Sequence, residues 1–249
     1  MSIPITGISS MATRQMLADV SSDWTRRGGC DVQIESVGGV EASLRVLSGE
    51  MFDFVVLAAD AISKLVASGH VVASTSSELA RSSVAIAVRR GAAHPVVVTE
   101  EALRDAVLSA RCVGYSTGPS GQALQRLFAR WGIADEIRTR LVQAPPGVPV
   151  GELIRKGEVE LGFQQLSELM HLNGIDVIGS MPPGLEIDTI FSGAVCSAFT
   201  RANAARAFLD FIRSTAADEA IERNGMKSVR PAGRHDSQAA GATDVSSMT

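Results

Sequence analysis

The chain has 249 residues, of which 45% are hydrophobic, 20% are charged and 4% are aromatic. This length and apolar content are enough for one large or two small globular domains. The net charge is −4 and both signs are mixed along the chain, so we expect no nucleic-acid partner and no membrane insertion.

The first residues, Met-Ser-Ile-Pro-Ile-Thr-Gly-Ile, contain neither a charged segment nor an apolar run of signal-peptide length. As written, the sequence predicts a cytoplasmic protein, or a periplasmic one if an export segment was trimmed. The three cysteines show no CxxC spacing, and the four histidines lie far apart. The sequence therefore indicates no disulfide framework, no metal site and no cofactor.

Residues 3–8 have the pattern of a first strand, after which Ser9 and Ser10 are expected to cap a helix with an apolar stripe. Arg14 would lie in the first turn of that helix, where the helix dipole disfavours a cation. This position indicates either a contact with an anionic ligand or a side chain that points into water.

Residues 31–37 alternate as a strand does, and Gly38 and Gly39 follow. Glycines at a turn from strand to helix allow the backbone to approach a ligand closely. Glu41 would lie in the first turn of the next helix, where any protein favours a carboxylate.

Residues 52–57 are apolar except for Asp53, and such a run is typical of a strand buried on both faces of a parallel sheet. Asp60 would lie at the start of the helix after it. Strands and helices therefore alternate through this half of the chain, and the alternation predicts a doubly wound α/β unit.

The second half repeats the alternation. Strands are expected at residues 83–89, 112–115, 140–143 and 161–163, and helices at residues 100–110, 119–131, 148–156 and 166–172. Residues 189–199 are expected to return as a strand to the first unit, with helices at residues 203–213 and 217–224 after it. We predict one domain from residues 1–82 plus 195–230, a second from residues 83–194, and a disordered tail at residues 231–249.

The segment Val-Gly-Tyr-Ser-Thr-Gly-Pro-Ser-Gly at residues 113–121 is the most informative local pattern. Pro119 suits the first turn of a helix, and Ser116, Thr117 and Ser120 surround it with hydroxyl groups. Free backbone N–H groups, the positive end of the helix dipole and these hydroxyls together favour binding of an anion. The same pattern is also typical of an ordinary capped helix.

Two open α/β units joined by two crossing strands leave a cleft between them, and ligands bind outside the carboxyl ends of the strands. The glycine- and hydroxyl-rich turns described above all follow strands, so we expect them to face one cleft. The predicted ligand contacts are Ser9, Ser10, Arg14, Gly38, Gly39, Ser116, Thr117, Ser120, Gln165 and Ser192.

The sequence resembles the type II periplasmic solute-binding proteins, and most closely the molybdate-binding proteins among them. The resemblance extends to about residue 228. It is carried by Ser-Ser at residues 9–10, Ser-Val-Gly-Gly at residues 36–39, Gly-Glu-Met-Phe-Asp-Phe-Val-Val-Leu-Ala-Ala-Asp at residues 49–60 and Gly-Glu-Val-Glu-Leu-Gly-Phe at residues 157–163.

Three departures from the molybdate-binding pattern favour a different ligand. Gly38 and Gly39 replace the usual serine of the second turn, Gln164 and Gln165 stand near the position of the family's site tyrosine, and Arg14 adds a cation. Since arginine binds carboxylates in a bidentate manner, and amides and hydroxyls suit the rest of such an anion, an organic di- or tricarboxylate is the expected ligand.

The fold family also contains enzymes, among them an aconitate isomerase, which implies an allylic proton shift between cis and trans unsaturated acids. Such a reaction needs a general base and donors that stabilise negative charge. The candidates for the base are Glu41, Asp60, Tyr115, His171 and Cys196. Each also suits an ordinary structural role, so the spacing alone does not choose among them.

Two functions follow from these observations. The first is an isomerase of a small unsaturated carboxylate, favoured by the departures just described and by the missing export segment. The alternative is a non-catalytic binding protein for molybdate, tungstate or sulfate, with a permease of an ABC transporter as partner. We expect a monomer in either case; a sensory domain is a third possibility, but no helix-turn-helix is visible.

Overall fold

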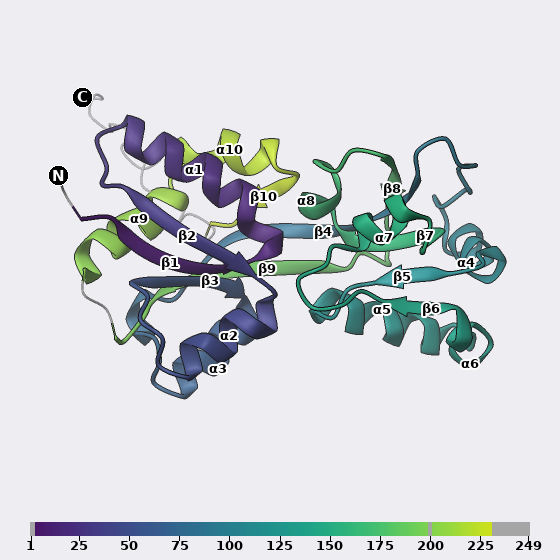
Figure 1. Ribbon diagram of the computed structural model, residues 1–249, viewed down its shortest axis with the longest axis horizontal. Coiled ribbons are helices and arrows are strands. Elements are labelled where there is room, and N and C mark those ends of the chain that lie inside the picture. The colour runs from purple at the N-terminus through teal and green to yellow at the C-terminus, as the bar shows by residue number, and fades with distance from the viewer. Residues whose placement is uncertain (1–2, 199–200, 231–249) are drawn as a thin grey trace, which may run out of the picture.

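The computed structural model of the protein describes residues 3–198 and 201–230 (Figure 1). The strands are β1 Ile5–Ser10, β2 Val32–Val37, β3 Phe54–Ala58, β4 Ser77–Arg89, β5 Val113–Tyr115, β6 Leu141–Gln143, β7 Leu161–Gln165, β8 Ile175–Ser180, β9 Asp188–Val195 and β10 Met226–Ser228. The α-helices are α1 Arg14–Arg26, α2 Gly39–Leu47, α3 Ala59–Ala67, α4 Glu100–Ser109, α5 Pro119–Arg130, α6 Ala134–Ile137, α7 Val150–Lys156, α8 Leu166–Leu169, α9 Ala202–Ile212 and α10 Asp218–Arg223. Short 3-10 helices are η1 Met11–Thr13, η2 Ala73–Thr75, η3 Arg138–Arg140 and η4 Thr215–Ala217.

The strands are hydrogen bonded in the order β2-β1-β3-β9-β4-β7-β5-β6, and β8 and β10 also pair with β4. β1 is parallel to β2 and β3, and β5 is parallel to β6 and β7. The long strand β4 links these two parallel groups, because its first half pairs with β9 and its second half with β7 and β8. We call β1–β3, β9, β10 and helices α1–α3, α9 and α10 the first lobe, and β5–β8 with α4–α8 the second lobe.

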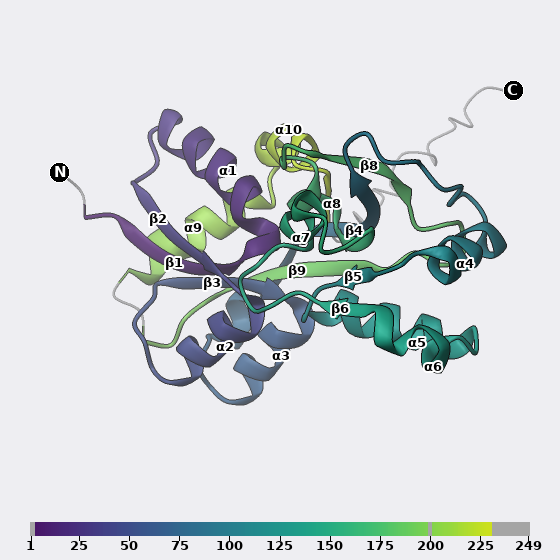
Figure 2. The same cartoon turned by 45° about the vertical axis from the view of Figure 1, so that its right-hand side comes forward.

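Helices cover both faces of the sheet in each lobe (Figure 2). In the first lobe, α1, α9 and α10 pack in one apolar cluster, and α2 and α3 pack in another. β3 separates the two clusters, since Phe54 and Val56 belong to one and Val55 and Leu57 to the other. Both faces of β3 are thus buried, as its apolar residues predict. The predicted α/β fold class is confirmed.

The start of the chain differs from the prediction. β1 continues through Ser9 and Ser10 because these residues pair with Ser36 and Val37 of β2. The predicted helix cap at Ser9 and Ser10 is therefore wrong. Ser10 instead precedes η1 without a side-chain capping bond, and α1 begins only at Arg14.

Two strands were not predicted. β8 and β10 both pair antiparallel with β4, which lies far from each of them in the sequence. No local sequence pattern therefore predicts these two strands. β4 is also longer than expected and runs without interruption through the predicted domain boundary after residue 82. The tail predicted at residues 231–249 lies outside the described residues.

Candidate ligand-binding cleft

A cavity of about 300 Å³ lies between the two lobes. It is lined by the turns that follow β1, β2 and β3 in the first lobe and β5, β6 and β7 in the second, together with Thr189 and Phe191 of β9. The carboxyl ends of the parallel strands of both lobes therefore meet at one place, where ligands bind in open α/β sheets.

Two helices of the first lobe begin at the cavity. Gly38, Gly39 and Val40 line it at the start of α2, and Asp60 and Ala61 line it at the start of α3. Neither helix has a side-chain capping bond. The first N–H groups of a helix lack intrahelical acceptors, so these two starts present free donors and positive dipole ends to the cavity.

The second lobe contributes the start of α5. Residues 116–120 line the cavity, Pro119 is the first residue of the helix, and the Oγ atoms of Ser116 and Ser120 lie 3.1 Å apart. Gly121 allows this tight turn, since a Cβ atom there would lie only 1.9 Å from the carbonyl oxygen of Ser116. Hydroxyl and backbone donors of the second lobe therefore face those of the first.

Two buried polar atoms at the cavity have no hydrogen-bond partner within the described part of the chain. They are Ser10 Oγ and Gln165 Oε1, and both residues line the cavity. The amide nitrogen of Gln165, Nε2, is paired, since it donates to Thr189 Oγ1 at 2.7 Å. Because buried polar groups are almost always paired, these two atoms indicate a place for a polar ligand.

Glu168, in the short helix α8, also lines the cavity and was missed by the sequence analysis. Gln164 Nε2 donates to Glu168 Oε2 at 2.7 Å, and the backbone N–H of Gly151 donates to Gln164 Oε1 at 3.3 Å. Burial raises the pKa of the Glu168 carboxyl to about 7, against a smaller lowering effect of the Gln164 hydrogen bond. Near neutral pH this carboxyl can therefore accept and return a proton.

The other charged side chains of the cavity lie on α3. Of the described residues that line the cavity, Lys64 is the only cation, and both Lys64 and Asp60 are exposed. Lys64 was not among the predicted contacts. Its position adds one positive charge to a cavity whose other donors are neutral.

The structure brings most of the predicted contacts together. Those that line the cavity are Ser10, Gly38, Gly39, Ser116, Thr117, Ser120 and Gln165, and Asp60 among the candidate bases lines it as well. Whether each of them contacts a ligand stays a prediction.

Three predicted contacts lie away from the cavity. Arg14 is exposed at the start of α1; η1 carries the lining residues Met11 and Ala12, and Arg14 lies beyond them. Ser9 is fully buried in β1, where its Oγ lies 2.8 Å from the Oγ of Ser36. Ser192 is buried in β9, which pairs it with β3 and β4.

The remaining candidate bases also lie away from the cavity. Tyr115 is buried and its hydroxyl oxygen accepts a hydrogen bond from Gln125 at 2.6 Å, while Glu41 is exposed on α2. His171 is hydrogen bonded to Asn224. Cys196 is buried, and burial raises the pKa of its thiol to about 12, so at neutral pH the thiol keeps its proton.

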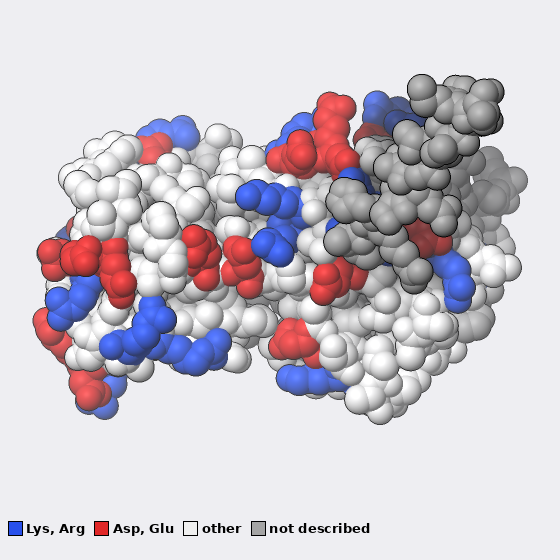
Figure 3. All heavy atoms as spheres, turned by 180° about the vertical axis from the view of Figure 1, so that it is seen from behind, with Lys and Arg blue, Asp and Glu red and all other residues white. Residues whose placement is uncertain are grey.

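Within residues 3–198 and 201–230, no three or more His, Cys, Asp or Glu side chains are grouped so that they could hold a metal ion. In the same residues, no helix has the length and apolar character needed to cross a membrane. On the face shown in Figure 3, acidic and basic side chains are interspersed.

Comparisons with known proteins agree with the fold described above. Residues 5–227 match a family model described as bacterial extracellular solute-binding protein. The chain is 34% identical over 231 residues to an aconitate isomerase of a Pseudomonas species, and the match covers 90% of this chain and 88% of that relative. The family description gives no support to the predicted cytoplasmic location.

Two solved structures share the fold. One is the periplasmic molybdate-binding protein of Azotobacter vinelandii, with a TM-score of 0.76, 17% identity and coverage of 92% of this chain and 100% of that chain. The other is the sulfate-binding protein of Mycobacterium tuberculosis, with a TM-score of 0.74, 17% identity and coverage of 92% of this chain and 88% of that chain. These similarities establish the fold alone.

Proposed function

This chain belongs to the family of bacterial extracellular solute-binding proteins, and we propose that it binds a small organic di- or tricarboxylate between its lobes and isomerises it. The reaction would be an allylic proton shift of the kind that interconverts cis- and trans-aconitate. Identity of 34% to an aconitate isomerase, over most of both chains, supports this choice.

The observation that carries the proposal is the convergence of three helix starts on one cavity. The first turns of α2, α3 and α5 supply backbone donors from both lobes, and the unpaired hydroxyl of Ser10 lies among them. A ligand with several carboxylates can place one group at each start, where the dipole favours negative charge. Lys64, an exposed lining residue, can neutralise part of the remaining charge.

Proton NMR of the purified protein with cis-aconitate tests the proposal. We expect the alkene and methylene signals of trans-aconitate to appear, and heat-denatured protein gives the background rate. Unchanged spectra for cis-aconitate, trans-aconitate and related unsaturated acids would contradict isomerisation.

A second candidate function is non-catalytic binding of molybdate, tungstate or sulfate for an ABC transporter with a permease partner. The neutral hydroxyl and backbone donors of the cavity favour it, because such donors suit any small oxyanion. A thermal-shift panel separates the two candidates, since a ligand at 100 times its dissociation constant stabilises the fold by about 2.7 kcal/mol. A response to molybdate or sulfate with none to carboxylates would favour this candidate.

A further inference from the structure

Among the described residues, three charged side chains line the cavity. Asp60 and Lys64, on α3 of the first lobe, are exposed, whereas Glu168 is half-buried. We propose that the Glu168 carboxylate is the catalytic base of the isomerisation and that Gln164 is its positioning residue. This inference rests on the proposed function and assigns the residue that performs it.

The hydrogen bonds of Glu168 leave one carboxylate oxygen available. Oε2 accepts from Gln164 Nε2 at 2.7 Å, and Gln164 is itself held by the backbone N–H of Gly151. Among the described residues, no hydrogen bond reaches Oε1. The carboxyl is thus oriented through one oxygen while the other can approach a C–H group of a substrate.

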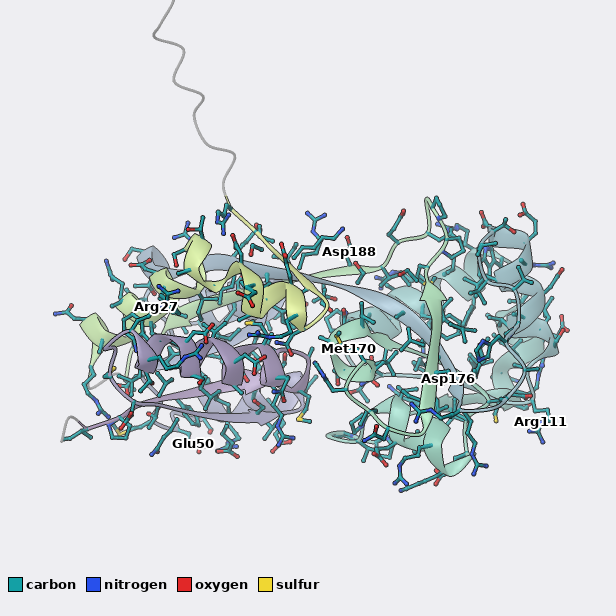
Figure 4. The ribbon with its side chains drawn as sticks, turned by 90° about the horizontal axis from the view of Figure 1, so that it is seen from above. Arg27, Glu50, Arg111, Met170, Asp176 and Asp188 are labelled. Atoms are coloured by element: carbon teal, nitrogen blue, oxygen red, sulfur yellow. The ribbon has the colours of Figure 1, made fainter. Side chains whose placement is uncertain are left out.

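The helix that carries Glu168 is fixed against β4 and against the first lobe. The Oγ atoms of Ser167 and Ser82 lie 3.4 Å apart, and a Cβ atom at Gly225 would lie 2.8 Å from the sulfur of Met170 and 2.9 Å from Cγ of Leu166. Figure 4 shows Met170 at the junction between the lobes. α8 therefore holds the carboxyl in place with respect to both walls of the cavity.

The proton transfer balances without any other reactant. Glu168 removes a proton from the methylene carbon of the bound tricarboxylate, and the electron pair of that C–H bond moves into the allylic system. The protonated Glu168 then returns a proton to the former alkene carbon at the other end, so the double bond has moved and the base is restored. The helix starts of α2 and α5 stabilise the negative charge that develops between these steps.

The decisive experiment compares Glu168→Gln with a matched control, Glu158→Gln, in which the same change is made at an exposed carboxylate outside the cavity. Gln at position 168 keeps an oxygen that accepts from Gln164. We expect turnover of cis-aconitate to fall by about 100- to 10,000-fold in Glu168→Gln, with the dissociation constant for trans-aconitate changed less than about tenfold. The control should behave as the wild-type protein.

Exchange in D₂O adds a second readout. We expect the wild-type protein to incorporate deuterium from solvent into the methylene position of the substrate and Glu168→Gln to lose this exchange together with turnover. If the wild-type protein isomerises and Glu168→Gln retains turnover within tenfold, the assignment of the base is wrong and the proposed function stands. If the wild-type protein binds the acids but neither isomerises nor exchanges them, the proposed function fails and the base with it.

The pH profile of the wild-type protein tests the same assignment without substitution. After correction for ionisation of the substrate, measured separately by NMR, kcat/KM should rise with pH through about 7, because the base must lose its proton. In Gln164→Leu the hydrogen bond that lowers the pKa of Glu168 is lost, so the rise should move to higher pH. An unchanged profile in Gln164→Leu would contradict the positioning role.

Discussion

At the scale of the residue, the raised pKa of Glu168, the proposed base, has a cost in stability. Its pKa is raised from an ordinary value of 4.5 to about 7, so between these values the folded protein holds a proton that the unfolded chain has released. Stability must then fall as pH rises through this interval. Glu168→Gln removes the titration, and we expect it to be more stable than the wild-type protein by as much as about 3 kcal/mol at pH 8 and by less than about 1 kcal/mol at pH 5.

Urea unfolding at the two pH values measures this difference, with Glu158→Gln as the control. The exposed control should change the free energy of unfolding little at either pH. An equal effect of Glu168→Gln at pH 5 and pH 8 would mean that the carboxyl does not titrate with a raised pKa in the folded protein.

Ser10 is predicted to act on binding and not on folding. Its Oγ is buried without a partner in the described residues, so Ser10→Ala should leave the melting temperature unchanged or raise it slightly. A hydrogen bond to a charged ligand is worth about 1.5–3 kcal/mol, so affinity for trans-aconitate should fall by about 10- to 100-fold. Calorimetric titration measures both variants, with Ser21→Ala as control, because Ser21 Oγ is also buried and unpaired but lies outside the cavity.

The sequence predicts a cavity residue when that residue belongs to a pattern of a few neighbouring residues. Gly38, Gly39 and Ser116 belong to turns whose pattern of strand, turn and helix is visible within a few residues, and all three line the cavity. Glu168 and Lys64 could not be found in this way, because their place in the cavity lining depends on where distant segments position α8 and α3. The Gln-Gln-Leu-Ser-Glu run at the end of β7 was the available signal.

At the scale of the element, the turn between β5 and α5 shows how tightly a donor site is built. A Cβ atom at Gly121 would lie 1.9 Å from a backbone oxygen, which cannot move without shifting the turn. We expect Gly121→Ala to destabilise the fold by about 1–3 kcal/mol and to weaken carboxylate binding, since Ser116 and Ser120 would be displaced. Gly118→Ala is the control for stability, because a Cβ atom there meets nothing within 4 Å.

Melting curves and ligand titration of Gly121→Ala decide this prediction. Wild-type stability in that variant would mean that the turn adjusts easily.

The helices and strands were predicted correctly where the periodicity of the sequence is strong, as in β3, α5 and α9. They were missed where pairing is distant, as in β8 and β10, and the end of β1 was misplaced because its ladder with β2 continues through two serines.

At the scale of the molecule, the arrangement of two lobes about one cleft follows from the alternation of strands and helices together with the long strand β4. The first lobe and the second lobe each bring parallel strand ends to the cavity, as the sequence predicts. The sequence did not predict how α8 of the second lobe packs on the first. α8 lies against Ser82 and Gly225, and His171 just after it is hydrogen bonded to Asn224, so its packing depends on segments far apart in the chain.

Asn224 links the two lobes outside the cavity lining and gives the last prediction. It is fully buried, its Nδ2 donates to Asp19 Oδ2 at 2.9 Å and to the Ala220 carbonyl at 2.8 Å, and its Oδ1 accepts from His171 Nε2 at 2.9 Å. Asn224→Ala leaves several of these groups unpaired, so we expect a loss of at least about 2 kcal/mol in unfolding free energy. Because His171 follows α8, turnover should also fall, through kcat more than KM, while the pH at which kcat/KM rises stays unchanged. Asn203→Ala, exposed on α9, is the control, and full turnover in a destabilised Asn224→Ala would show that this contact stabilises the fold without positioning Glu168.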